Sequence, residues 1–180
     1  DDETLRNQIH ADIDDMQAMV DATLDYLRGL QDKEAIQTID IHALLHSLVA
    51  DEQALGRAVD FSGSRCTPYP GRVSALKRAL ANLIDNAVKY GHAAHLSVVD
   101  DAESLHIVVT DDGPGIPAGD LERVVEPYVR LETSRSRTTG GVGLGLAVAR
   151  DAARLHGGEL VLENRPEGGL RATLVLPRLK

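Results

Sequence analysis

The apolar residues of the first 30 positions follow an alternating four-three spacing, which predicts one long helix. This spacing is typical of the seam of a coiled coil or a helical bundle. A lone helix of this length is marginal in water, so we expect the seam to pair with a second helix or with another copy of itself. A terminal helix packed on its own domain is the alternative. The seam positions are Ile9, Ile13, Met16, Val20, Leu27 and Leu30, with Thr23 filling one gap.

A polar stretch separates this helix from a segment in which helix and strand patterns alternate. Gly29 and Gln31-Asp32-Lys33-Glu34 predict a hinge. Asp40 can cap a helix, because a carboxylate accepts a hydrogen bond from the free N–H groups of a first turn. The apolar face of that helix contains Ile41, Leu44, Leu45, Leu48 and Val49. The next predicted elements are a strand at 58–61, a loop at 63–71, a helix from about 73 to 90 that Gly91 ends, and an antiparallel strand pair at 95–99 and 105–109.

The remaining pattern predicts a short helix at 118–125, a helix at 144–156 and strands at 159–163 and 171–176. Residues 133–139 are too hydrophilic to pack, and we expect them to be mobile. Because helices are interleaved with antiparallel strands, we expect an α/β (α+β) fold. It should be a two-layer sandwich in which helices cover one face of a mixed, mostly antiparallel sheet.

Length, composition, net charge and cysteine content limit the classes of protein to which this chain can belong. A length of 180 residues suits one α/β domain plus an appendage, and a hydrophobic fraction of 43% fits a soluble globular protein. No apolar run approaches the roughly 20 residues of a membrane helix and no signal peptide opens the chain, although a membrane-anchored parent protein is compatible with this. The net charge of −9 argues against nucleic-acid binding. Cys66 is the single cysteine, which favours a reducing compartment.

The stretch Asp111-Asp112-Gly113-Pro114-Gly115-Ile116-Pro117 follows a predicted strand almost directly. A strand that ends in an acid and then in glycines presents a fixed carboxylate beside accessible backbone, which suits a polar ligand. An ordinary turn would have the same composition, so this stretch is ambiguous when it is taken alone.

A second polar stretch lies on one side of the predicted 73–90 helix. Helical spacing places Asn82, Asn86, Lys89 and Tyr90 beside the apolar face. Amide oxygens there can coordinate a hard cation, and a lysine can contact a phosphate. A solvated helix flank is the simpler interpretation of this stretch alone.

A third stretch, Gly140-Gly141-Val142-Gly143-Leu144-Gly145-Leu146, immediately precedes a predicted helix. Exposed backbone N–H groups at the start of a helix favour phosphate binding. The spacing fits neither the dinucleotide fingerprint nor the P-loop. A flexible glycine linker is the alternative.

Together these stretches resemble the ATP-binding domain of sensor histidine kinases, within the superfamily shared with DNA gyrase, Hsp90 and MutL. Residues 82–90 are similar to the N box, 111–115 to the first glycine box, 126–130 to the F box and 141–145 to the second glycine box. Tyr128 replaces the usual Phe of the F box. The resemblance covers about residues 36–176 and implies a Bergerat fold. Residues 1–30 resemble the second helix of a dimerisation and phosphotransfer hairpin, which leaves 31–180 as the catalytic domain.

The resemblance implies an ATP and Mg²⁺ site. Asn86 would bind the Mg²⁺, with Asn82 on the same side, and Lys89 and Arg130 would reach the phosphates. Asp111 would accept a hydrogen bond from the adenine amino group, and residues 116–140 would form a lid. The further nucleotide-binding residues that it implies are Tyr90, Gly113, Gly115, Ile116, Tyr128, Gly141, Val142, Gly143, Leu144 and Gly145.

The chemistry expected of this site is phosphate transfer rather than hydrolysis. The superfamily's ATPases have a general-base Glu at the position of Asn82, and an amide cannot activate water. No histidine in the chain has the flanking residues of the family's phosphoacceptor; His10 is the least implausible substitute. His42 and His46 have zinc-like spacing but lack a third ligand, so we interpret them as surface histidines. His156 is expected to cap its helix.

We therefore expect the catalytic part of a truncated sensor histidine kinase. Its expected partners are the parent's phosphotransfer hairpin, a response regulator and a second kinase copy. The location would be the cytoplasmic portion of a bacterial inner-membrane sensor. A superfamily ATPase and a non-catalytic nucleotide-binding module are the alternatives, and a serine kinase of the anti-sigma type fits the coiled-coil start poorly.

Overall fold

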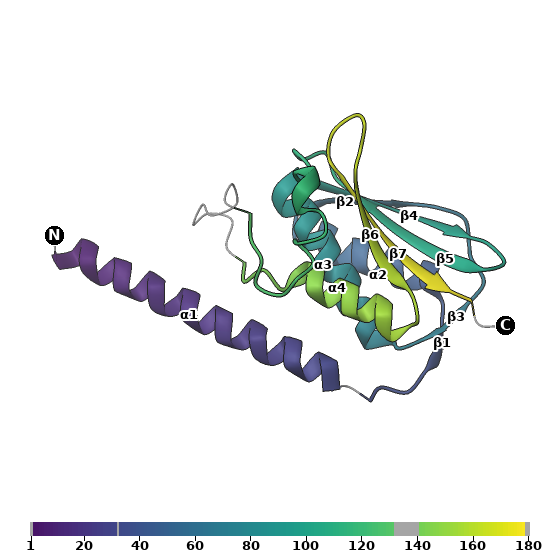
Figure 1. Ribbon diagram of the computed structural model, residues 1–180, viewed down its shortest axis with the longest axis horizontal. Helices are drawn as coiled ribbons and strands as arrows, with labels where there is room; N and C mark the ends of the chain where they lie inside the picture. The colour runs from purple at the N-terminus through teal and green to yellow at the C-terminus, as the bar shows by residue number, and fades with distance from the viewer. Residues whose placement is uncertain (1, 32, 132–140, 179–180) are drawn as a thin grey trace.

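Helix α1 (Asp2–Gln31) extends along one side of the domain in the computed structural model, which describes residues 2–31, 33–131 and 141–178 (Figure 1). The predicted helix is confirmed, and Gly29 lies inside it rather than in a hinge. Among the described helices, none is both long and apolar enough to cross a membrane. Most of the apolar side chains along α1 are exposed: Leu5, Ile9, Ile13, Met16, Met19, Val20, Leu24 and Leu27.

A different side of α1 contacts the domain. The Tyr26 hydroxyl donates to Asp151 Oδ2 at 2.7 Å, and Gly29 lies against the Arg78 guanidinium. Thr23, which the four-three spacing assigned to the seam, contacts Tyr128 instead. The apolar stripe therefore remains at the surface, while smaller and polar residues hold the helix to the domain.

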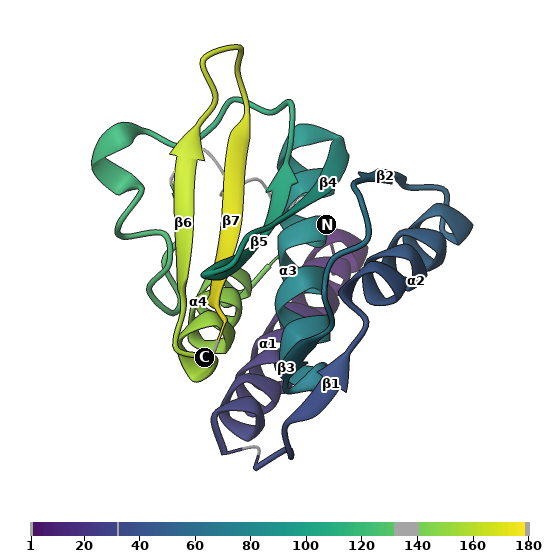
Figure 2. The same cartoon turned by 90° about the vertical axis from the view of Figure 1, so that its right-hand side faces the viewer.

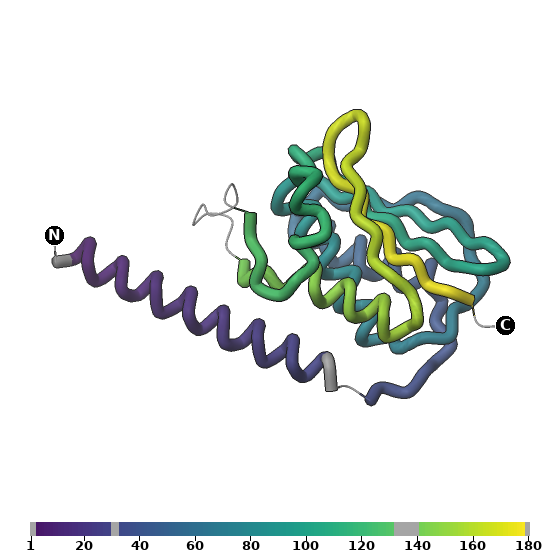
Figure 3. Tube along the Cα trace, in the orientation of Figure 1, coloured from purple at the N-terminus to yellow at the C-terminus, as the bar shows by residue number. Residues whose placement is uncertain are grey.

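The centre of the domain is a five-stranded sheet with the order β2-β4-β5-β7-β6. Its strands are β2 (Ala58–Ser62), β4 (Ala93–Asp100), β5 (Ser104–Thr110), β6 (Glu159–Asn164) and β7 (Leu170–Pro177). Strands β2 and β4 are parallel, and the other three pairs are antiparallel. This confirms the predicted mixed, mostly antiparallel sheet, and Figure 3 follows the chain through it.

Helices α2 (Ile41–Ala54), α3 (Val73–Gly91) and α4 (Gly145–Leu155) cover one face of this sheet, as predicted (Figure 2). The predicted cap is confirmed, because Asp40 Oδ1 accepts a 2.9 Å hydrogen bond from Ala43 N. The core lies between the layers. Its largest fully buried side chains are Ile41, Leu45, Leu76, Leu80, Leu83, Ile84, Leu96, Leu105, Ile107, Leu174 and Leu176.

Two local predictions are wrong. The loop predicted at 63–71 ends in strand β3 (Tyr69–Gly71), which pairs with β1 (Gln37–Ile39) through long-range contacts that the local pattern does not encode. The helix predicted at 118–125 is reduced to the 3-10 turn η1 (Ala118–Asp120) followed by turns, because few of its side chains are buried. The mobile stretch predicted at 133–139 lies outside the described residues.

Candidate functional site

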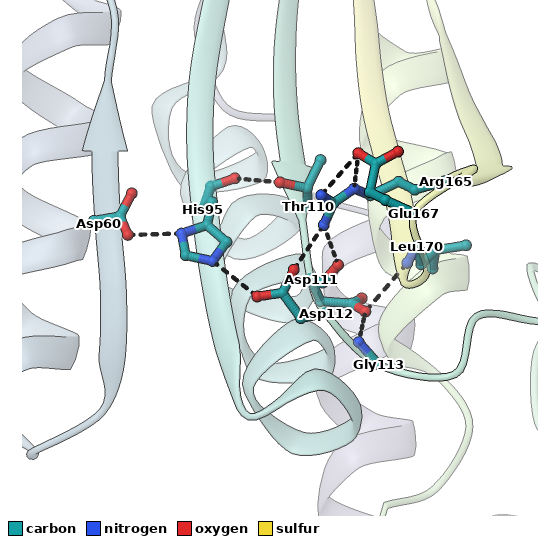
Figure 4. Close-up of polar contacts among 9 residues, drawn as sticks. All are labelled: Asp60, His95, Thr110, Asp111, Asp112, Gly113, Arg165, Glu167 and Leu170. Carbon is teal, nitrogen blue, oxygen red and sulfur yellow. Dashed lines mark hydrogen bonds and ion pairs between the residues drawn. The ribbon is translucent and has the colours of Figure 1, made fainter.

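Asp111 follows β5 directly and is held by backbone groups of two segments. Asp111 is only 6% exposed. Its Oδ1 accepts hydrogen bonds from Gly113 N at 2.8 Å and Leu170 N at 3.1 Å (Figure 4). Its own N–H donates to Leu170 O at 3.0 Å. Among the described residues, Oδ2 has no hydrogen-bond partner. The carboxylate is thus fixed in direction with one oxygen available.

The backbone packs tightly around Asp111. A side chain at Gly91, the last residue of α3, would overlap the Asp111 side chain, and one at Gly169 would overlap the Asp111 carbonyl oxygen. A Cβ at Gly113 would lie 2.7 Å from Tyr90 O. These close approaches bring the first glycine box against the C-terminal end of α3, where the N box ends.

The polar side of α3 faces the start of α4. Asn82 Nδ2 donates to Arg78 O at 2.9 Å, so its Oδ1 points toward α4, 3.1 Å from the position of a Cβ on Gly145. The Asn86 side chain is half-buried and makes no hydrogen bond with any described residue. The N box and the second glycine box therefore face each other across the α3–α4 contact.

Lys89 lies at the edge of the second glycine box, with a basic neighbour. A Cβ on Gly141 would be 2.6 Å from Lys89 Nζ, which is also 5.5 Å from the centre of the Tyr90 ring. Burial lowers the pKa of Lys89; Arg130 lowers it further, while Asp85 raises it. A polyphosphate beside these two cations would favour the charged lysine, because it offsets both the desolvation and the repulsion.

The F box packs under the second glycine box through its backbone. Tyr128 N donates to Gly143 O at 2.9 Å, and a Cβ on Gly143 would lie 2.9 Å from Val129 O. Tyr128 has a φ of 66°, is 50% exposed and directs its hydroxyl to Thr23 Oγ1 at 3.3 Å. The side chain thus lies on α1 in this structure, and its predicted contact with nucleotide stays a prediction.

The donor set fits a magnesium ion that arrives bound to phosphate. Neutral amide oxygens are acceptable Mg²⁺ ligands, but Mg²⁺ sites in proteins usually combine few protein ligands with substrate phosphates and water. The described residues contain no group of three or more His, Cys, Asp or Glu side chains that could hold a metal alone. Asn86, the predicted ligand, would therefore need the phosphates to complete the coordination.

Comparison with known proteins identifies the family. A family model described as histidine kinase-, DNA gyrase B- and HSP90-like ATPase matches residues 71–180. The chain belongs to this family. The sensor histidine kinase GtrS of Pseudomonas aeruginosa is 43% identical over 178 residues, which are 99% of this chain and 37% of that protein.

Solved structures agree with this assignment. The ATP-binding domain of PrrB from Mycobacterium tuberculosis has a TM-score of 0.67 and 31% identity, covering 82% of this chain and all of that one. Full-length ShkA, solved in complex with AMPPNP, has a TM-score of 0.77 over 96% of this chain and 38% of that one; at 22% identity it supports the fold alone. The chain spans 25–40% of the length of the curated relatives it matches. The chain therefore contains the catalytic ATP-binding domain of a sensor histidine kinase.

The predicted surface histidines His42 and His46, and the helix-capping His156, lie on other parts of the kinase domain. His42 and His46 form an aromatic cluster with Phe61, with their ring centroids 4.6 Å apart, and no third metal ligand joins them among the described residues. His156 is the C-cap residue of α4, as predicted, and its Nδ1 hydrogen-bonds Ala152 O at 2.7 Å. Its Nε2 accepts from Arg72 N at 2.9 Å, a contact across the domain that sequence reasoning missed.

Sequence reasoning also missed two residues of the kinase domain that contact the first glycine box. Asn164 exchanges two hydrogen bonds with the backbone of Ile116, and Arg165 donates to Asp111 O at 2.6 Å. Both follow from the pairing of β5 with β7 and of β7 with β6, so only a correct strand order could have indicated them.

Proposed function

We propose that this domain binds Mg-ATP and transfers the γ-phosphate to a histidine on a dimerisation hairpin, for onward transfer to a response-regulator Asp. The observation that carries the nucleotide site is Asp111, whose Oδ1 is held by two backbone N–H groups while Oδ2 is available. An acceptor fixed in this way suits the exocyclic amino group of adenine and would reject the carbonyl of guanine.

The phosphates would lie between the N box and the second glycine box. Lys89 and Arg130 supply positive charge, and the start of α4 after Gly143 supplies backbone N–H groups and the positive end of a helix dipole. Asn86 would bind a Mg²⁺ carried by the phosphates. Bound there, the ion would neutralise charge on the phosphate oxygens.

Asn82 favours phosphotransfer over hydrolysis. Its amide donates to Arg78 O and has no basicity, so the site offers no general base at the position where the family's ATPases have one. The domain would hold ATP and exclude rapid water attack until an imidazole approaches.

We propose that residues 1–30 are the second helix of the hairpin, because the apolar stripe of α1 is exposed and suited to pairing with another helix.

Asp111→Asn tests the nucleotide assignment with little change in shape. The amide oxygen can keep both backbone hydrogen bonds, which places Nδ2, a donor, opposite the adenine amino group. We expect wild-type Mg-ATP affinity in the micromolar to sub-millimolar range, worth about 5–8 kcal/mol. Isothermal titration calorimetry should show a loss of about tenfold or more for ATP in the variant, and a lower ATP/GTP preference. Unchanged ATP binding would mean that the adenine assignment is wrong.

A transfer assay tests the kinase step. The chain is mixed with γ-labelled ATP and a separately supplied phosphoacceptor hairpin of a sensor kinase, and we expect acid-labile label on the hairpin. Steady ATP turnover without the hairpin, lost in Asn82→Ala, would instead support an ATPase. Nucleotide binding with neither label transfer nor turnover would support a non-catalytic module.

A further inference from the structure

Two adjacent residues, one at the end of β6 and one directly after it, contact the first residue of the first glycine box and the residue that follows the box. Asn164 is the last residue of β6, and Arg165 begins the turn to β7. The antiparallel pairing of β5, β7 and β6 brings this turn beside the exit of β5, where Asp111 lies (Figure 4). Residues more than 45 positions apart in the chain are therefore in direct contact.

Arg165 holds the main chain of Asp111. Its Nη1 donates to Asp111 O at 2.6 Å and to Asp112 Oδ1 at 2.9 Å. Its Nε and Nη2 both donate to Glu167 Oε1, at 3.1 and 2.9 Å, which fixes the plane of the guanidinium. The side chain is only 16% exposed. The Arg165 guanidinium thus links the residues that follow β5 to the β6–β7 turn in a single orientation.

Asn164 holds the other end of the same segment. Its Oδ1 accepts from Ile116 N at 2.8 Å, and its Nδ2 donates to Ile116 O at 2.6 Å. These two hydrogen bonds satisfy both backbone groups of Ile116, as a neighbouring strand would. The backbone of residues 111–116, which belongs to no helix or strand, is therefore fixed at both ends by side chains from the end of β6 and the turn that follows it.

A binding group is effective only when its support keeps it in position. A displacement of about 1 Å at a recognition atom can cost a large factor in affinity or rate. The direction of the Asp111 carboxylate depends on its main chain, which Arg165 holds directly. Asn164 prevents the glycine-rich segment after Asp111 from moving away.

We propose that Asn164 and Arg165 are positioning residues for nucleotide selection, holding the first glycine box so that Asp111 faces the adenine ring. This inference rests on the proposed nucleotide site. It adds a determinant of adenine specificity outside the four sequence boxes. A structural role in closing the β6–β7 hairpin is the competing explanation, and it predicts equal effects on all nucleotides.

Arg165→Gln is the main test, with Arg178→Gln as a matched control. Arg178 follows β7 at its opposite end, is 15% exposed and donates to Asp100, Thr67 and Pro68. Both substitutions remove a mostly buried guanidinium and its hydrogen bonds, Arg165 from the turn before β7 and Arg178 from the position directly after β7. Dissociation constants for Mg-ATP and Mg-GTP are measured by calorimetry, and unfolding is followed in urea.

We expect Arg165→Gln to weaken ATP binding about tenfold while GTP binding changes little, so that the ATP/GTP preference falls. Arg178→Gln should leave the preference unchanged at a similar loss of stability. Asn164→Asp is the second variant: it keeps the acceptor for Ile116 N but faces Ile116 O with a carboxylate. It should lower the preference in the same way, even if Arg165→Gln fails to fold.

The inference is overturned if Arg165→Gln and Asn164→Asp keep the wild-type ATP/GTP preference, as Arg178→Gln should. This outcome can be distinguished from a failure of the proposed function, because the two give different results with Asp111→Asn and with the wild-type domain. If Asp111→Asn loses ATP selectivity but Arg165→Gln and Asn164→Asp do not, the nucleotide site stands and the positioning role falls. If the wild-type domain does not prefer ATP at all, both fall.

Discussion

The Tyr26 hydroxyl donates a 2.7 Å hydrogen bond to the carboxylate of Asp151, which ties helix α1 to helix α4. Arg150 continues this contact, because its guanidinium pairs with Asp151 at 3.1 Å and with Glu126 of the F box at 2.7 Å. A chain of polar contacts therefore links α1 to the segment that packs under the second glycine box. The attachment of α1 and the position of the F box are expected to influence each other.

Tyr26→Phe should loosen α1 without unfolding the domain. It removes a hydrogen bond to a carboxylate that keeps Arg150 as a partner, so we expect a loss of about 1 kcal/mol or less. Because α1 is a long helix with little packing of its own, hydrogen exchange of its amides should accelerate in the variant. Thr23→Val, which removes only the 3.3 Å contact with Tyr128, is the control and should have a smaller effect.

The titration of Tyr26 provides a second readout of the same contact. Burial, followed by the hydrogen bond to Asp151, raises the pKa of Tyr26 to about 12. Because the folded pKa lies above the unfolded one, the stabilisation is complete below about pH 10 and is lost as the pH rises toward 12. An ultraviolet difference titration between wild type and Tyr26→Phe should show the missing phenol near the upper value; ionisation near 10 would argue against the contact.

His95 should stabilise the domain more at low pH than at high pH. Its Nδ1 lies 2.7 Å from Asp60 Oδ2 and its Nε2 lies 3.3 Å from Asp112 Oδ2. The hydrogen bond to Asp60, then that to Asp112, raises the pKa of His95. The stabilisation is full below the unfolded pKa of about 6.5 and is lost as the pH rises through the raised folded value. The difference in urea stability between wild type and His95→Gln should therefore shrink on going from about pH 6 to about pH 9.

His156 should show the opposite dependence. Its imidazole accepts from Arg72 N and donates to Ala152 O, which requires the neutral form. Burial lowers the pKa of His156. Its stabilisation is present above about pH 6.5 and is lost as the pH falls toward the lowered folded pKa. Relative to His156→Gln, the wild type should lose urea stability on going from about pH 7 to about pH 5; a trend matching that of His95→Gln would contradict this assignment.

Gly169→Ala should destabilise the domain far more than Gly168→Ala. Both residues have positive φ, 90° and 105°, so each alanine would cost about 1–2 kcal/mol through backbone strain. A Cβ at Gly168 meets nothing within 4 Å, whereas one at Gly169 would overlap the Asp111 carbonyl. We expect roughly 3 kcal/mol or more for Gly169→Ala by urea denaturation. Equal losses in the two variants would show that the turn yields without disturbing Asp111.

The sequence by itself determined the long first helix, the main helices and strands of the domain and the four boxes of the site. These features depend on periodicity, caps and glycines within short stretches, where the physical cause is local. Asp40 caps its helix, Gly91 ends its helix, and Asp111 follows its strand because neighbouring residues require it. The relation of the boxes to ATP came from their resemblance to a known family.

The tertiary structure alone decided which distant side chains support the site. The pairing of β1 with β3, the parallel pairing of β2 with β4 and the contact of Tyr128 with α1 all join segments far apart in the chain. The hydrogen bond from Arg165 to Asp111 O also joins segments that are far apart in the chain. Such contacts depend on strand order and helix packing, which sum many weak interactions over the whole domain and leave no local pattern. The resemblance predicts that Asp111 recognises adenine, and the fold fixes the direction in which its carboxylate points.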